Sequence, residues 1–516
     1  MAHRDPEYLG YYPGAEVVFA VVCPLGTPYN RVVEALGNYL SHFGYKTKRV
    51  QLSDYFDDLL LQLGSDLSRE GDDAVAIAFH KIAAGNKIRQ ITEKNDIMAL
   101  VAAGAIADWR NEENKALGRK SSQKRSFPLT NTAYVISTVR RPEEVATLRR
   151  IYGSGFFLIG VNASREEREH YLSEKGIDAD LASRLMETDA KEKLEFGQAT
   201  RDAFQMADVF LSGDAAGGAY ADQVSRFLDL LFGCPILTPT PEEQAMFMAY
   251  AASLRSGDLS RQVGAAIIDA HGDLISVGCN EAPKPGGGLY DPPSLGKTSH
   301  RDIELGEDSN EREKETMADR IVQDEREKET MADRIVQELG GGIDPKTVRT
   351  SLKTAGFFDI TEFGRSVHAE MEALLACARS GRSARDAILY TTTFPCHNCT
   401  RHIIAAGISR VIYIEPYAKS RASDLHPDEI SVDREETGKV PFLPFVGVGP
   451  RRYFDLFSLT LSTGYPIERK KYGKLIPWAR ATAAVRLQVK QHVLGAGIAC
   501  LWNAESDTIF TWLARN

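Results

Sequence analysis

The chain has 516 residues, of which 43% are hydrophobic and 26% are charged, the proportions of a globular protein. That length exceeds what one hydrophobic core usually organises, so two or three domains are expected. The formal net charge of −9 argues against a broad nucleic-acid-binding surface, which needs basic patches. The 7 cysteines are odd in number and scattered, which favours reduced thiols in a cytoplasm. The first residues lack the apolar run of a signal peptide, and no stretch reaches the ~18 apolar residues of a membrane span. We therefore expect a cytoplasmic protein.

The first 235 residues alternate strand-like and helical segments. Strand patterns occur at residues 16–27, 46–52, 133–138, 156–161 and 208–212, and helical patterns at 29–43, 87–109 and 142–152. This alternation predicts an α/β domain with a parallel sheet covered by helices on both faces. The polar and basic stretch 110–126 is expected to be an exposed loop.

The turn after the first strand resembles a phosphate-binding P-loop. The strand and its turn, together with residues 137–153 and 156–169, resemble the P-loop domain of nucleoside and nucleotide kinases. A Walker A loop needs G-x-x-x-x-G-K-[ST], whose lysine reaches the phosphates. Here the turn Cys23–Asn30 reads CPLGTPYN, with one glycine and no lysine. We therefore expect either a regulatory nucleotide site near Gly26 and Thr27, or a structural and oligomerising role, in place of kinase activity.

A proline-containing junction at residues 233–243 separates this region from a second domain. It holds three prolines, and a helix with one apolar face is predicted directly after it at residues 243–254. Two short strands at residues 263–269 and 274–278 then predict a β-hairpin. The chain leaves this hairpin through Asn280 into a glycine-rich loop.

Two short motifs supply three metal-binding side chains and an acid, His368-Ala369-Glu370 and Pro395-Cys396-His397-Asn398-Cys399. Helices starting near His368 and Cys396 would place an imidazole, a carboxylate and two thiolates at their N-terminal ends. One nitrogen and two sulfur ligands suit a catalytic zinc, which leaves a fourth position for water, whereas structural zinc sites are closed by four ligands. H-x-E…P-C-x-x-C is the signature of zinc deaminases. We predict one zinc ion on His368, Cys396 and Cys399, with Glu370 as the catalytic acid and base. His397 and His402 are close enough in the sequence to be alternative ligands, but His397 lies between the cysteines and we expect it to be exposed.

The hairpin, the Asn280 loop and the two motifs together resemble the deoxycytidylate deaminase branch of the cytidine deaminase superfamily, over about residues 243–460. With the P-loop-like domain in front, the chain resembles the two-domain bacterial dCTP/dCMP deaminases that deplete deoxycytidine nucleotides during phage infection. The resemblance implies a C-terminal α/β/α fold and the hydrolysis of dCTP, and also dCMP, to the uracil nucleotide and ammonia. It also implies a homo-oligomer, with a nucleotide effector (dTTP or dCTP) and a small antitoxin RNA as candidate partners. The lack of a long apolar stretch predicts no membrane partner.

Contacts to the substrate are expected around the zinc site. The resemblance implies that Asn280 binds the deoxyribose or the base, although an asparagine here could also be a turn residue. Phosphates could be bound by Arg261, Gln262, Lys419 and Ser420, and Tyr417 could stack on the base or serve in packing.

The chain adds two segments to this deaminase-like core. Residues 289–363 are a large insertion, in which residues 311–323 recur letter for letter as 325–337. We predict that the repeat forms a charged, exposed helix without a catalytic role. Residues 461–516 are read as a C-terminal extension with a helical run at 477–493.

Two other functions remain open. A deaminase of polynucleotide cytidine or adenosine would need a basic groove, which the net charge opposes. A non-catalytic nucleotide sensor would tolerate the change Glu370→Ala.

Overall fold

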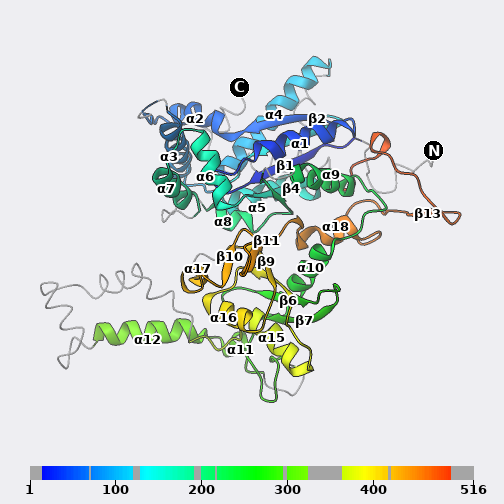
Figure 1. Cartoon of the computed structure of the whole chain (residues 1–516). Helices are drawn as coiled ribbons and strands as arrows, with labels where there is room; N and C mark the ends of the chain where they lie inside the picture. The colour runs from blue at the N-terminus through cyan, green and yellow to red at the C-terminus, as the bar shows by residue number, and fades with distance from the viewer. Residues whose placement is uncertain are drawn as a thin grey trace, which may run out of the picture. The chain divides into compact units, whose positions relative to one another are not determined.

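The computed structural model describes residues 14–68, 71, 73–119, 128–190, 199–214, 218–293, 299–323, 363–416 and 420–489 (Figure 1). The chain forms two compact units. Unit 1 comprises Met1–Gln244 and Pro444–Asn516, and unit 2 comprises Ala245–Leu443. Unit 2 therefore ends before the predicted limit at residue 460, because β12 (Gly447–Val448) pairs with a strand of unit 1.

Unit 1 is built on a six-stranded sheet in the order β12-β5-β4-β1-β3-β2. Its longer strands are β1 (Val17–Val22), β2 (Lys46–Gln51), β3 (Thr132–Ser137), β4 (Phe156–Asn162) and β5 (Val209–Ser212). These five pair in parallel, as predicted, and β12 is antiparallel to β5. Every residue of β1 is buried, because a central parallel strand is covered on both faces.

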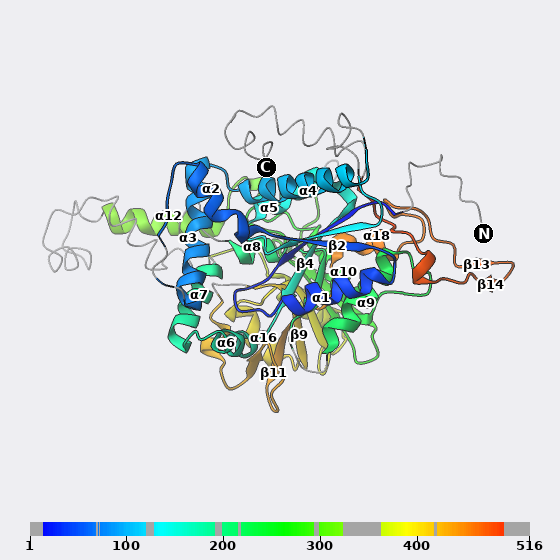
Figure 2. The same cartoon turned by 90° about the horizontal axis from the view of Figure 1, so that it is seen from above.

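Helices α1 (Asn30–Ser41) and α9 (Ala219–Leu231) pack side by side against one face of this sheet, as Figures 1 and 2 show. The helical pattern predicted at residues 87–109 belongs to two helices, α3 (Ala74–Thr92) and α4 (Ile97–Ala116). Glu93 separates them, because its left-handed backbone (φ 52°) ends α3. Helix α4 continues to Ala116, so residues 110–116 are helical and do not belong to the predicted loop.

The remaining elements of unit 1 are short. Its other helices are α2 (Phe56–Gln62), α5 (Pro142–Tyr152), α6 (Arg165–Glu174), α7 (Ala179–Ala190), α8 (Thr200–Phe204) and α18 (Tyr453–Phe457), and a small hairpin joins β13 (Lys470–Lys471) to β14 (Lys474–Leu475). The helix predicted at residues 477–493 is wrong for its described part, which has only a 3-10 turn at Arg480–Thr482. The chain is extended there because Val485 and Leu487 enter the core, while the buried Arg486 binds four backbone carbonyls of residues 455–459.

Unit 2 contains a second six-stranded sheet in the order β10-β11-β9-β8-β6-β7. Its strands are β6 (Gly264–Ile268), β7 (Leu274–Cys279), β8 (Ile388–Thr393), β9 (Arg410–Glu415), β10 (Ile430–Val432) and β11 (Val440–Pro444). The β6–β7 pair is the predicted antiparallel hairpin. Strand β8 pairs antiparallel with β6 and parallel with β9, which makes the sheet mixed.

Two helices cover opposite faces of the hairpin. A Cβ atom on Gly264 would lie against the backbone of α10 (Pro241–Ser253), and one on Gly278 would lie against the backbone of α15 (Ala369–Ser380). Gly278 pairs with Ala265, the neighbour of Gly264, so the two glycines point to opposite faces. Around the hairpin the layers are therefore helix, sheet and helix, as expected for the α/β/α fold.

The described part of the insertion forms α11 (Asp302–Leu305) and α12 (Ser309–Gln323). Figure 1 shows the start of α12 beside α11 and the rest of the helix extending away from the sheet of unit 2. The second copy of the repeat, residues 325–337, lies outside the described residues. Among the helices that the structure describes, none is both long and apolar enough to cross a membrane.

Candidate active site

The N-terminal ends of α15 and α16 (His397–Ala405) bring three metal-binding side chains together. His368 is the N-cap residue of α15, Cys396 is the N-cap residue of α16, and Cys399 lies in the first turn of α16. The chain before α15 is fixed by a backbone pair between Glu281 and Val367, with N···O distances of 3.2 and 3.0 Å. The chain that leaves β7 therefore helps to position His368.

The geometry of this group fits a zinc ion. The His368 Nδ1 atom lies 3.3 Å from the Cys396 Sγ atom and 3.4 Å from the Cys399 Sγ atom. Zn–N bonds of about 2.0 Å and Zn–S bonds of about 2.3 Å at tetrahedral angles predict an N···S separation of about 3.5 Å. Within the described ranges, His368, Cys396 and Cys399 are the one group of three such side chains that could hold a metal ion, and His397 and His402 are not part of it.

Each of the two thiols changes the pKa of the other. The hydrogen bond from Cys399 and the contact with His368 lower the pKa of Cys396 to about 4, whereas the neighbouring Cys396 and burial raise the pKa of Cys399. The hydrogen bond to Cys396 raises the pKa of His368 to about 9. Helix N-termini favour negative charge, so both helices help to stabilise the thiolates that a metal requires.

Glu370 lies in the first turn of α15, next to these ligands. Its side chain is buried, and the Cys399 Sγ atom is 3.5 Å from its Oε2 atom. Burial raises the pKa of Glu370, and the nearby Cys396 adds to the effect. His368, Glu370 and Cys396 all line one cavity of about 280 Å³. A carboxyl group in this position can exchange protons with a molecule in the cavity.

Asn280 lines the same cavity and also fixes the strand beside it. Its Oδ1 atom accepts a hydrogen bond from the Val263 amide (2.7 Å), and its Nδ2 atom donates one to the Arg261 carbonyl (2.8 Å). An amide side chain can accept a second bond at oxygen and donate a second from nitrogen. Both readings of Asn280, as a turn residue and as a binding residue, are therefore compatible with its geometry.

The other predicted contact residues divide into three groups. Arg261 lines the cavity, and its Nη1 atom is 2.8 Å from a Glu415 carboxylate oxygen. Gln262 and Ser420 do not line the cavity; they donate hydrogen bonds to the carbonyls of Ser256 and Pro395. Tyr417 and Lys419 lie outside the described residues.

The insertion contributes side chains that the sequence did not indicate. Five lining residues belong to it, namely Asp302, Asp308, Asn310, Glu311 and Lys314. The prediction that the repeat is exposed is therefore wrong for Lys314, which is buried, while Glu311 and Arg312 are exposed as expected. The only sequence signal was the unusual position of a charged segment between the hairpin and the first zinc motif.

Unit 1 has a cavity of about 230 Å³ at the carboxyl ends of β1, β2 and β3, where ligands commonly bind in α/β sheets. Lys81, Arg89 and Arg140 line it, together with one acid, Glu144. Glu144 is already bonded to the Arg89 guanidinium (2.8 Å) and to two backbone amides. The lining is thus positively charged overall.

The predicted effector residues lie next to this cavity but do not line it. Gly26 has a positive φ of 86°, and a Cβ atom there would be 3.0 Å from the Arg168 carbonyl on α6. Thr27 is buried. Their neighbours Leu25 and Tyr29 do line the cavity.

Comparison with known proteins decides the nature of unit 2. Residues 239–415 match the family described as "Cytidine and deoxycytidylate deaminase zinc-binding region". Residues 239–415 are therefore similar to the zinc-binding region of these deaminases. The fit of His368, Cys396 and Cys399 to zinc agrees with this assignment.

Several proteins are similar to parts of the chain. ComE operon protein 2 of Bacillus subtilis is 35% identical over 15% of this chain and 48% of its own length. The deoxycytidylate deaminase of Enterobacteria phage T2 is 40% identical over 11% of this chain and 29% of its own. The chain thus spans about half, or less, of these relatives. A UPF0200 protein of Halobacterium salinarum is 26% identical over 32% of this chain and 87% of its own. The solved dCMP deaminase of cyanophage S-TIM5, in complex with dCMP and dUMP, is 18% identical, with 40% of this chain and 99% of that one aligned at a TM-score of 0.23.

Proposed function

We propose that unit 2 is a zinc-dependent hydrolytic deaminase of deoxycytidine nucleotides, which converts dCTP and dCMP to dUTP and dUMP and releases ammonia. The observation that carries the proposal is the buried carboxyl group of Glu370 beside a three-ligand metal group in one cavity. A structural zinc site needs four ligands and no acid. The zinc-binding deaminase domain and the deoxycytidylate deaminases among its relatives support the choice of substrate.

The residues of the cavity have distinct roles in this reaction. When bound by His368, Cys396 and Cys399, zinc supplies an activated water at its open coordination position. Glu370 takes a proton from the water as the water oxygen bonds to C4 of the cytosine ring. It delivers this proton to N3, and then transfers the second proton, from the new C4 hydroxyl, to the amino group. The C4=O bond forms as the C4–N4 bond breaks, and ammonia leaves. Asn280 and Arg261, which line the same cavity, orient the nucleotide.

The variant Glu370→Gln tests the assignment, because it keeps the size of the side chain but cannot carry the proton. We expect wild-type protein loaded with zinc to release ammonia from dCTP and dCMP. We expect the variant to lose at least about a hundredfold in kcat, the usual contribution of general acid–base catalysis, while its zinc content by mass spectrometry is unchanged. Wild-type protein that holds zinc and releases no ammonia from any cytosine nucleotide would refute the proposal.

The same assay separates the two alternative functions. A polynucleotide deaminase would act on single-stranded DNA or RNA and leave free dCTP intact. A non-catalytic sensor would show the same biological activity in wild type and in Glu370→Gln.

We also propose that this activity depletes deoxycytidine nucleotides during phage infection, on the basis of the two-domain organisation that the sequence resembles. Cells that express the wild-type chain should show a lower dCTP pool and fewer plaques than cells that express Glu370→Gln. Equal plaque numbers for the two would rule out a defence role that depends on deamination. Homo-oligomerisation and inhibition by a small RNA stay predictions.

For unit 1 we propose a regulatory site for dTTP or dCTP in the cationic cavity at the ends of β1, β2 and β3. The net positive lining and the absence of a Walker A lysine support binding without phosphoryl transfer. Lys81→Gln should weaken dTTP binding in equilibrium dialysis, and it should leave the kcat/KM for dCMP unchanged when dTTP is absent. Undiminished dTTP binding by the variant would place the effector elsewhere.

A further inference from the structure

The start of the insertion is built into the wall of the active-site cavity. Of its residues, Asp302 begins α11, Asp308 directly precedes α12, and Asn310, Glu311 and Lys314 lie on α12. All five side chains line the same space as His368 and Glu370. A ligand bound near the zinc group would therefore touch the insertion as well as the deaminase core.

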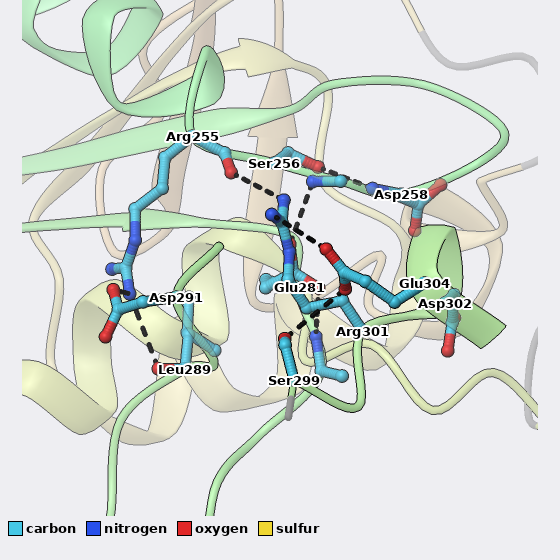
Figure 3. Close-up of polar contacts among 12 residues, drawn as sticks. Arg255, Ser256, Asp258, Glu281, Leu289, Asp291, Ser299, Arg301, Asp302 and Glu304 are labelled. Atoms are coloured by element: carbon cyan, nitrogen blue, oxygen red, sulfur yellow. Dashed lines mark hydrogen bonds and ion pairs between the residues drawn. The ribbon is translucent and has the colours of Figure 1, made fainter. Parts of the chain in front are cut away.

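A buried ion pair fixes the entrance of the insertion to the core. The Arg301 Nε atom is 2.8 Å from the Glu281 Oε2 atom, and the Gly257 amide donates to the same oxygen at 2.8 Å. Both charged side chains are less than a tenth exposed. Figure 3 shows Arg301 at the centre of this network, between the Arg255 carbonyl, Glu281 and Glu304. Since Glu281 follows Asn280, the insertion is attached directly beside a predicted binding residue.

A second set of contacts fixes the start of α12 to the segment that leads to His368. The Arg365 Nη1 atom binds the Asp302 carboxylate at 2.9 Å, and the Arg365 amide donates to the Ser309 hydroxyl at 3.2 Å. The same hydroxyl donates to the Phe363 carbonyl at 3.1 Å. The start of the insertion is therefore bonded to the core in two places. Arg301 binds Glu281, and the first residue of α12 is bonded to the segment that leads to His368.

Lys314 is a buried cation in this wall. It is 4% exposed, and its Nζ atom is 3.1 Å from an oxygen of Glu311, whose own side chain is 56% exposed. An ammonium group has three N–H donors and is costly to bury unless it is well paired. In the part of the chain that the structure describes, Glu311 accounts for one of the three donors, so Lys314 can bind an anion in the cavity.

The carboxylates nearby are already bonded to donors of the protein. Asp302 is bonded to Arg365, and Asp308 accepts from the Ser260 hydroxyl (3.1 Å) and the Asn310 amide (2.9 Å). Asp258, which also lines the cavity, accepts from the backbone amides of Ser260 (2.9 Å) and Arg261 (3.3 Å). Arg261, the other lysine or arginine of the lining, is paired with Glu415 and its side chain is 47% exposed. Lys314 is therefore the buried cation that an anionic substrate group meets in this wall.

We propose that Lys314 binds the phosphate group of the nucleotide that lies nearest the deoxyribose, so that the insertion selects nucleotides over nucleosides. The inference rests on the proposed deaminase function of unit 2. It assigns a specificity role to a segment that is an addition to the deaminase-like core.

Kinetics of Lys314→Gln test this assignment with substrates that differ only in the phosphate. The KM for dCMP should rise about ten- to a hundredfold, as for the loss of one hydrogen bond between charged groups. The inhibition constant of deoxycytidine, which lacks the phosphate, should not change. Lys314→Arg should restore part of the affinity for dCMP because it keeps the charge.

Arg312→Gln is the matched control, because Arg312 lies on the same helix and its half-exposed side chain binds Glu307 and Glu313 outside the cavity. This variant should behave as wild type. Equal effects of Lys314→Gln on dCMP and deoxycytidine, or no effect on either, would overturn the inference while an active wild type upholds the proposed function. A zinc-loaded wild type without activity on any cytosine nucleotide would instead reject the proposed function itself.

Discussion

Single side chains in this protein often have two uses. Asn280 holds the backbone of Arg261 and Val263 and still faces the cavity. Arg452 is buried in unit 1, where its guanidinium pairs with both Asp208 and Asp455. Residue type alone does not separate these uses, because arginine suits phosphates and carboxylates equally well.

Asp455 gives a pH-dependent prediction at this scale. Its carboxylate accepts hydrogen bonds from the Thr463 amide (3.0 Å), the Thr463 hydroxyl (2.8 Å) and the Arg452 guanidinium (2.9 Å). Burial by itself would raise the pKa of Asp455, but these bonds hold it below the ordinary value. Ionised Asp455 therefore stabilises the fold above the pKa of the unfolded chain, about 3.9, and this contribution is lost as the pH falls through the lower folded pKa.

We expect Asp455→Asn to lower the free energy of unfolding by about 1–3 kcal/mol at pH 7. The difference from wild type should shrink as the pH falls below about 4. Urea unfolding followed by tryptophan fluorescence at several pH values measures both effects. A difference that stays constant down to pH 3 would contradict the argument.

At the scale of elements, close packing of helices on the hairpin positions the site. Helix α15 carries Glu370 and begins directly after His368, and it approaches β7 so closely that only glycine fits at position 278. A Cβ atom there would lie 2.2 Å from the Ala369 carbonyl oxygen and 2.5 Å from the Ala373 nitrogen. Both are backbone atoms, so the helix itself would have to move.

Gly278→Ala should therefore reduce activity far more than the added methyl group suggests. A displacement of about 1 Å at a catalytic group costs about a hundredfold in rate. We expect a loss of this order in kcat/KM for dCMP, together with weaker zinc retention on dialysis against a chelator. Gly37→Ala is the control, since Gly37 lies inside α1 and a Cβ atom there meets nothing closer than 3.9 Å. The control should keep full activity and gain up to about 1 kcal/mol in stability.

At the scale of the whole molecule, the two units differ in their content of tryptophan, the residue whose fluorescence reports unfolding. All four tryptophans, Trp109, Trp478, Trp502 and Trp512, belong to the segments of unit 1, whereas the zinc-binding residues belong to unit 2. Metal binding contributes to the stability of the domain that holds the metal. The two units should therefore respond differently to a chelator.

Removal of zinc should lower the melting temperature of the calorimetric transition of unit 2 by several degrees. A loss of about 1 kcal/mol in unfolding free energy shifts the melting temperature of a domain of this size by roughly 2–4 °C. The melting curve followed by tryptophan fluorescence should stay unchanged. A parallel shift of both signals would show that the units unfold together. Cys396→Ser should reproduce the effect of the chelator on the calorimetric transition without one present.

The sequence by itself determined the zinc site and the alternation of strands and helices, because both depend on residues close together in the chain. His368, Glu370, Cys396 and Cys399 fall within two short motifs, and each motif starts a helix, so local spacing was enough. Only the tertiary structure placed Lys314 in the cavity and returned β12 to the sheet of unit 1. These arrangements join segments that are far apart in the chain, and no periodicity within a segment specifies its distant partner.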